Sequence, residues 1–251
     1  MASVERVIEG LPDDTQRLLG RYGQEVKAAF GDRLEGLLIY GSAVRGEFLP
    51  GRSNLNLLLV MTHMDAAALT LYGPIHKRWG KEQIVVPLFL LRRELSVLSA
   101  RFPLEFLEIQ EHHRVLGGLD PFVGFRIDIG GLREEVLQGL AGNVLRLRQR
   151  FVEGGGTNDS VTILLPLSVT SMLPLLRGLQ RLMQWPVPLL ADAVIQDVAT
   201  RLSLDLQALH DALLLKRGQI TPGPAEVPRL FDRYLQAATA LAESAAGVVS
   251  G

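Results

Sequence analysis

Residues 37–60 constrain the fold of this 251-residue chain more than any other stretch. They begin with a short apolar run, residues 37–40, of the kind that forms buried strands. Gly41 and Ser42 follow, and a glycine at this place lets the backbone turn sharply and bring amide groups close to an anion. A second largely apolar run, residues 53–60, predicts another strand. The segment therefore predicts a strand, a tight turn able to seat a phosphate, and a second strand.

Polar side chains interrupt the second predicted strand at two places. Side chains alternate between the faces of a strand, so Asn54 and Asn56 are expected on one side and Leu55 and Leu57 on the other. Two amides would then stand side by side near the turn. Arg45 directly follows the turn, where a guanidinium can donate two hydrogen bonds to a phosphate.

This pattern resembles the nucleotidyltransferase fold of the DNA polymerase beta superfamily. The signature of that family is a Gly-Ser turn followed by Asp-x-Asp on the next strand, and here Ser53-Asn54-Leu55-Asn56 stands in the place of Asp-x-Asp. The resemblance implies ATP or another nucleoside triphosphate with Mg²⁺, which the family holds with paired carboxylates. By the resemblance, the nucleotide-binding positions are Gly41, Ser42, Arg45 and Ser53, and the catalytic positions are Asn54, Asn56 and a third acid on a later strand.

The catalytic positions lack the charges that the family uses. Mg²⁺ prefers anionic oxygens, whereas an asparagine offers one neutral oxygen, so we assign no metal ligand here. Residues 102–109 predict the strand of the third acid, with Glu105 and Glu108 on opposite faces. We favour Glu108 for this role, and the alternative is that both glutamates are surface charges.

Two functions remain open from the sequence. The first is a catalytically impaired protein that acts as a nucleotide-binding or interaction module. The alternative is an active, Mg²⁺-dependent enzyme that moves a nucleoside monophosphate from a triphosphate to a small-molecule or protein acceptor. The effect of a divalent ion on nucleotide binding separates them, because only the enzyme requires the ion.

Composition narrows the partners. With 26 Lys+Arg against 27 Asp+Glu the net charge is −1, which argues against a nucleic-acid substrate. The absence of cysteine fits a reducing cytoplasm. The uncharged run 161–176 contains two prolines and is shorter than the ~20 apolar residues that span a membrane. A mean hydropathy of +0.20 instead favours a homo-oligomer or a bound partner protein.

The chain as a whole predicts an α+β protein of two domains. Residues 1–125 are expected to form a small mixed sheet with flanking helices, and residues 126–251 an all-α bundle like the one in kanamycin-nucleotidyltransferase-like proteins. Glycine and proline mark the boundary. An apolar stripe at helical spacing predicts a first bundle helix that Gly154 ends, and further helices are expected over residues 159–185, 191–202, 204–216 and 227–246.

Overall fold

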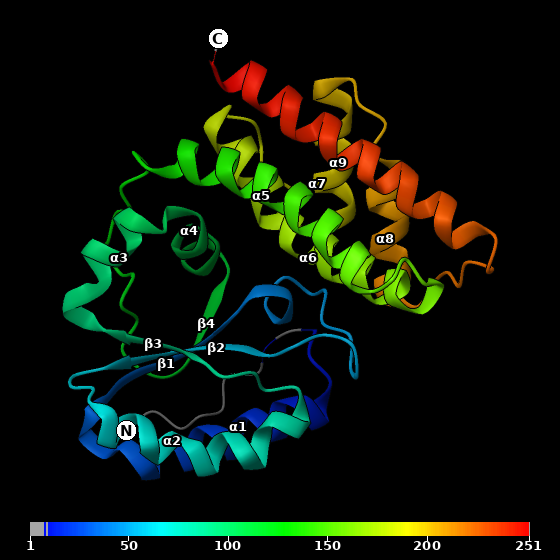
Figure 1. Cartoon of the computed structure of the whole chain (residues 1–251). Coiled ribbons are helices and arrows are strands. Elements are labelled where there is room, and N and C mark those ends of the chain that lie inside the picture. The colour runs from blue at the N-terminus through cyan, green and yellow to red at the C-terminus, as the bar shows by residue number, and fades with distance from the viewer. Residues whose placement is uncertain (1–7, 9, 251) are drawn as a thin grey trace. The chain divides into compact units, whose positions relative to one another are not determined.

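The structure is a computed structural model, and it describes residues 8 and 10–250. The chain divides into two compact units (Figure 1). Unit 1 runs to Asp128 and unit 2 begins at Ile129. Unit 1 holds a mixed sheet with helices, and unit 2 is helical, so the predicted α+β class is confirmed.

Unit 1 is built around a four-stranded sheet with the order β3-β2-β1-β4. Strand β1 pairs antiparallel with β2 and with β4, and β2 pairs parallel with β3. The described elements of this unit are α1 (Asp13–Phe30), η1 (Gly31–Arg33), β1 (Leu34–Tyr40), η2 (Gly41–Ala43), β2 (Asn56–Met61), α2 (Ala66–Trp79), η3 (Gly80–Glu82), β3 (Leu88–Leu91), η4 (Arg92–Glu94), α3 (Leu95–Arg101), α4 (Pro103–Glu111) and β4 (His113–Gly118).

The two faces of the sheet bury separate apolar clusters. Leu57 and Leu59 belong to the cluster shared with α1 and α2, whereas Leu58 and Val60 belong to the cluster shared with α3 and α4. Figure 1 shows the two helix pairs on opposite faces of the sheet. The alternation predicted for the leucines of the second strand is therefore confirmed, and the face that continues toward Asn56 is the one under α3 and α4.

Local signals in the sequence account for the ends of two helices. Helix α1 stops before Gly31, whose φ of 54° lies in the left-handed region that glycine tolerates best. Helix α2 starts after Asp65, whose Oδ1 accepts a hydrogen bond from the backbone nitrogen of Ala68 at 2.7 Å. This bond satisfies one of the amide groups that the first turn of a helix leaves without a partner.

The strand predicted over residues 102–109 is wrong, because this segment forms helix α4. Pro103 takes the first helical position, where its missing N–H costs nothing. Leu104 and Ile109 are both buried, so this short helix has apolar side chains on more than one side. Its sequence therefore lacks the single apolar stripe that indicates an amphipathic helix. As a consequence, Glu105 and Glu108 are separated by about one helical turn and lie on the same side of α4 rather than on opposite faces.

The predicted strand over residues 84–91 is shorter in the structure. Only Leu88–Leu91 form β3, and Ile84 makes an isolated bridge to Leu55. Strand β3 lies at the edge of the sheet and begins directly after Pro87. This placement agrees with the general confinement of proline to strand ends and edge strands.

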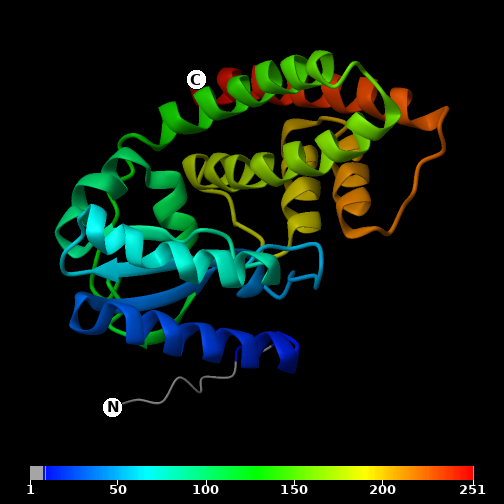
Figure 2. The same ribbon diagram turned by 60° about the horizontal axis from the view of Figure 1, so that its bottom comes forward.

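Unit 2 is a bundle centred on α6, which packs against the four other helices described for this unit. Figure 2 shows α5 and α9 running beside each other. Helix α5 ends at Gly154 as predicted, and Gly155 and Gly156 follow with left-handed φ angles of 65° and 63°. The bundle consists of α5 (Leu132–Glu153), α6 (Asn158–Leu182), α7 (Ala191–Leu202), α8 (Gln207–Arg217) and α9 (Glu226–Ser250).

A buried chain of hydrogen bonds joins three helices of the bundle. The Tyr234 hydroxyl on α9 donates to Ser168 Oγ on α6 at 3.0 Å. Ser168 Oγ donates in turn to Asn143 Oδ1 on α5 at 2.9 Å, and Asn143 Nδ2 donates to Ser171 Oγ at 2.7 Å. Each buried polar group in this hydrogen-bonded network thereby gains a partner, which keeps the free-energy cost of burying the group low.

Among the described residues, one helix is long and apolar enough to cross a membrane, and that helix is α6. Half of its most apolar window is buried within the protein, and α6 packs against the rest of the bundle. A core helix of a bundle shows the same composition for this reason.

Candidate functional site

The turn that follows β1, residues 41–45, is the centre of the candidate site, and we call it the Gly41 turn. Gly41 has a φ of 81°, and a Cβ added there would lie 3.0 Å from Nδ2 of Asn56. Both the backbone conformation and this close approach favour glycine. The amide of Gly41 donates to the carbonyl oxygen of His112 at 3.3 Å, so it is used within the protein. The amides of Ser42 and Ala43 follow in η2, in the first turn of a helix, where amides lack intrahelical partners.

The two asparagines occupy different environments. Asn56 is the first residue of β2, pairs with Tyr40 in the sheet and is half-buried against Gly41. Asn54 is exposed and precedes the strand, because β2 begins at Asn56, three residues after the predicted start at residue 53. The structure therefore brings Asn56 to the Gly41 turn and gives Asn54 a solvent-exposed position beside the strand.

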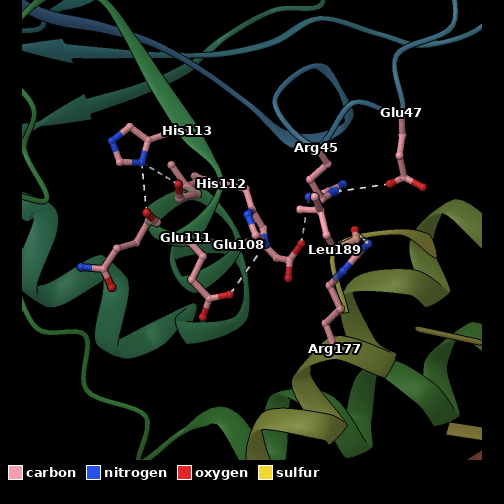
Figure 3. Close-up of polar contacts among 10 residues, drawn as sticks. Arg45, Glu47, Glu108, Glu111, His112, His113, Arg177 and Leu189 are labelled. Carbon is pink, nitrogen blue, oxygen red and sulfur yellow. Dashed lines mark hydrogen bonds and ion pairs between the residues drawn. The ribbon is translucent and has the colours of Figure 1, made fainter. Parts of the chain in front are cut away.

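Arg45 is the most heavily engaged residue of the turn. Its Nη1 donates to Glu108 Oε2 at 3.2 Å, and its Nε lies 3.5 Å from Glu47 Oε2. Figure 3 shows Arg45 between the two glutamates. The side chains of Arg45, Glu47 and Glu108 are only 12%, 12% and 10% exposed, and we call these three residues the Arg45 triad. One positive and two negative charges give the triad a formal charge of −1.

The triad gives Arg45 two partners that the sequence did not predict. Its guanidinium pairs with two carboxylates, and the phosphate contact expected from the sequence stays a prediction. Charges this far removed from water require such pairing, and breaking a buried pair by removing one partner costs about 3–5 kcal/mol. The triad also ties α4, which carries Glu108, to the turn.

Helix α4 supplies the two glutamates considered for the third acid, and the structure separates their surroundings. Glu108 is buried and reaches Arg45. Glu105 is exposed, and its negative charge acts on the phenol of Tyr40. Burial is the main cause that raises the pKa of Tyr40 to about 12, and the charge of Glu105 adds to it.

The two serines predicted to bind a nucleotide also differ in how deeply they are buried. Ser42 is half-buried in η2, and its carbonyl oxygen accepts from the backbone nitrogen of Glu47 at 3.0 Å. Ser53 is buried; its Oγ accepts from the backbone nitrogen of Leu49 at 3.0 Å, and its carbonyl oxygen accepts from Gln83 Nε2. Ser53 thus closes the loop between the turn and β2, and we no longer place it at a nucleotide.

The donor set at the turn does not fit the Mg²⁺ that the resemblance implied. Asn56 offers one neutral amide, and the carboxylates of Glu47 and Glu108 face the guanidinium of Arg45. Mg²⁺ requires anionic oxygens in nearly octahedral geometry. Over the residues that the structure describes, no three His, Asp or Glu side chains gather as a metal-binding group.

Reasoning from the sequence missed the part that Glu47 plays. The sequence analysis gives Glu47 no role, although this residue lies two positions from Arg45 and has the opposite charge. That spacing was the available signal for a local ion pair. The ion pair of Glu108 with Arg45 could not be predicted, because it depends on helix α4 and the sequence analysis assigned residues 102–109 to a strand.

Unit 2 contains cavities that no residue of the predicted site lines. One of about 520 Å³ lies between α7 and α8 and is bordered by Asp192 and His210. Both oxygens of Asp192 are bound by Arg217, at 2.9 and 2.7 Å, and the hydrogen bond from Arg217 is the main reason that the pKa of Asp192 is lowered. His210 Nε2 lies 3.0 Å from the same carboxylate. This network satisfies its own charges and links α7 to α8.

Comparisons with known proteins give a structural likeness but no match by sequence. No family model and no curated protein matches the sequence. The structure resembles spectinomycin adenyltransferase from Enterococcus faecialis, determined with ATP and spectinomycin, with a TM-score of 0.58 and 12% sequence identity over 89% of this chain and 98% of that chain. A likeness at this identity shows the fold, so the chain has the nucleotidyltransferase fold.

Proposed function

We propose that this protein is a nucleotide-binding or interaction module that has the nucleotidyltransferase fold and an impaired metal site. The observation that supports this most strongly is that the Gly41 turn has a neutral amide and an already paired acid at positions where the resembled family has metal-binding carboxylates. A neutral amide, that of Asn56, lies against Gly41, and the one acid that reaches the turn from α4, Glu108, is paired with Arg45.

The energetics of the reaction explain why this matters. In phosphoryl and nucleotidyl transfer the protein mainly positions the reactants and neutralises the charge that develops in the transition state. Metal ions held by carboxylates supply most of that neutralisation. Losing the anionic ligands therefore removes a principal catalytic device while leaving the fold in place.

A nucleotide remains the ligand that we propose for the turn. The structural neighbour was determined with ATP, which supports a nucleotide site in this fold. In this chain the hydroxyl and amide of Ser42 are the groups that we assign to a phosphate. The triad has a formal charge of −1, so a triphosphate gains little from Arg45, and we expect the affinity to be modest.

Calorimetric titration with ATP in the presence of EDTA tests this assignment. Replacing Ser42→Ala removes one hydrogen bond to the phosphate, worth about 0.5–1.5 kcal/mol, and should weaken binding by roughly twofold to tenfold. Ser96→Ala, at an exposed position on α3, is the matched control and should bind like the parent. If the parent binds no ATP at all, the nucleotide part of the proposal fails.

The competing proposal is an active transferase that moves a nucleoside monophosphate to a small-molecule or protein acceptor. The neighbour's name favours it, because that protein is an adenyltransferase of spectinomycin. Such an enzyme must use Mg²⁺ to bind its nucleotide productively, whereas the impaired module does not. The metal dependence of ATP binding therefore decides between the two.

We also propose that the protein is cytoplasmic and self-associates or binds a partner protein, without nucleic acid or membrane as a partner. Large apolar side chains stand exposed on α5 and α6 of the bundle, among them Leu145, Val152, Ile163 and Leu167. Exposed apolar surface of this kind supports an association site.

A further inference from the structure

We infer that a second cavity of the helical bundle binds a small monocarboxylate with an apolar body, at a site separate from the Gly41 turn. This cavity measures about 470 Å³ and lies where the connection from α8 meets α9. Figure 2 shows the connection as the orange loop that leads into α9. Every residue that lines the cavity belongs to unit 2, and its volume is typical of pockets for small ligands.

Apolar side chains form one part of the cavity lining. Leu230 on α9 is buried, whereas Ile220 and Pro222 in the connection are half-buried. The parts of Ile220 and Pro222 that remain exposed therefore border a hollow. An apolar group that fills this hollow releases the water in contact with these side chains, which favours binding.

Charged side chains form the other part of the lining, and all but one of them have partners within unit 2. Arg233 Nη2 lies 3.0 Å from Asp211 Oδ2. Glu226 Oε2 accepts a hydrogen bond from the backbone nitrogen of Gly223 at 2.7 Å. The guanidinium of Arg229 differs, because it makes no hydrogen bond or ion pair within the part of the chain that the structure describes. A ligand in the cavity therefore meets one cation that is open to it.

One open guanidinium beside apolar side chains selects the chemical class of the ligand. A guanidinium donates two parallel hydrogen bonds to a carboxylate, which matches the geometry of that group. A polyphosphate would bring several negative charges toward the carboxylates of Asp211 and Glu226, and an organic ammonium ion would bring a positive charge toward Arg229. A monocarboxylate with an apolar body avoids both conflicts.

This inference differs from the simpler view that Arg229 is an ordinary solvated arginine beside an empty hollow. Both views predict that replacing Arg229 has little effect on stability, because the side chain is exposed and has no partner in the described chain. Only the inference predicts saturable binding of a carboxylate that depends on Arg229 and on the apolar lining. The readout must therefore be ligand binding.

The experiment titrates hexanoate into the isotope-labelled full chain, without nucleotide, and follows the amide chemical shifts by NMR. Hexylamine, which has an apolar body and a positive charge, and inorganic phosphate, which has no apolar body, are the probe controls. The variants are Arg229→Gln, Arg229→Lys and Ile220→Gln. Arg148→Gln is the matched control, because Arg148 on α5 is likewise exposed, has no partner in the described chain and does not line the cavity.

We expect hexanoate to bind the parent with a dissociation constant of about 1 mM, and hexylamine and phosphate to bind about tenfold more weakly or not at all. Arg229→Gln should weaken hexanoate binding by about fivefold or more, because it removes a charge-assisted hydrogen bond. Arg229→Lys keeps the charge without the two-pronged geometry and should bind between these limits. Ile220→Gln should weaken binding by about threefold through the lost apolar contact, and Arg148→Gln should bind like the parent.

Three results would overturn the inference. They are a parent that shows no saturable shifts with hexanoate, an Arg229→Gln variant that binds hexanoate as well as Arg148→Gln does, and phosphate binding as tight as hexanoate binding. Melting curves show whether each variant is folded, and if Ile220→Gln is not, the Arg229 variants decide. No nucleotide is present in any titration, so the result is independent of the nucleotide site proposed at the Gly41 turn.

Discussion

Asn56 lies against the α-carbon of Gly41, so a neutral amide forms the wall of the turn at the end of β1. The contact exists because Gly41 has no side chain and adopts a positive φ. Four positions after Gly41, Arg45 is held by Glu47 and Glu108. Single residues thus determine the charge that a ligand would meet, while the backbone path is that of the nucleotidyltransferase fold.

Tyr40, the residue before the turn, gives a prediction about alkaline pH. Its folded-state pKa is raised from 10.0 to about 12, so the folded state resists ionisation that the unfolded state accepts. The stability that Tyr40 contributes is therefore fully present below pH 10 and is lost as the pH rises toward 12. In urea unfolding, the parent should lose stability relative to Tyr40→Phe by about 1.4 kcal/mol per pH unit in this window.

Comparison with the variant isolates Tyr40, because Tyr22 and Tyr72 also have raised pKa values and contribute with the same sign in both proteins. Parallel pH profiles of the parent and Tyr40→Phe between pH 10 and 12 would show that Tyr40 ionises equally in both states. That result would contradict the claim that the phenol of Tyr40 is buried beneath α4.

At the scale of elements, the spacing of apolar residues along the sequence predicted the type of most helices and strands. The bundle helices have long apolar stripes, and the second strand alternates between two clusters, so their type could be inferred from the sequence. Helix α4 could not, because a nine-residue helix buried on most sides resembles an apolar strand. The ion pair of Glu108 with Arg45 depends on that helix, and tertiary contacts of this kind leave no periodic trace.

The hydrogen-bonded chain between α5, α6 and α9 yields a stability prediction. Replacing Tyr234→Phe removes the donor to Ser168 Oγ in a fully buried place and should lower the free energy of unfolding by about 1–2 kcal/mol. Tyr40→Phe at neutral pH is the matched control, because the structure shows no hydrogen bond from that hydroxyl within its described residues. Equal urea midpoints for the two variants would mean that the buried chain adds nothing to the bundle.

On the scale of the whole molecule, each unit builds its own core. The sheet of unit 1 is buried on both faces by helices, and the bundle of unit 2 is organised around α6. The likeness to a spectinomycin adenyltransferase extends over 89% of this chain, although only 12% of residues are identical. A fold can persist in this way while the charges at its functional turn change, because packing and site chemistry are set by different residues.

Titration of the unsubstituted protein with ATP, first in excess EDTA and then in excess Mg²⁺, tests the central claim most directly. If the metal site is impaired, Mg²⁺ has no place to bridge the protein and the triphosphate. The dissociation constants in the two conditions should then agree within about threefold, a difference below 1 kcal/mol. ATP binding that requires Mg²⁺, or that tightens by about tenfold or more when it is added, would contradict the account and favour the active transferase.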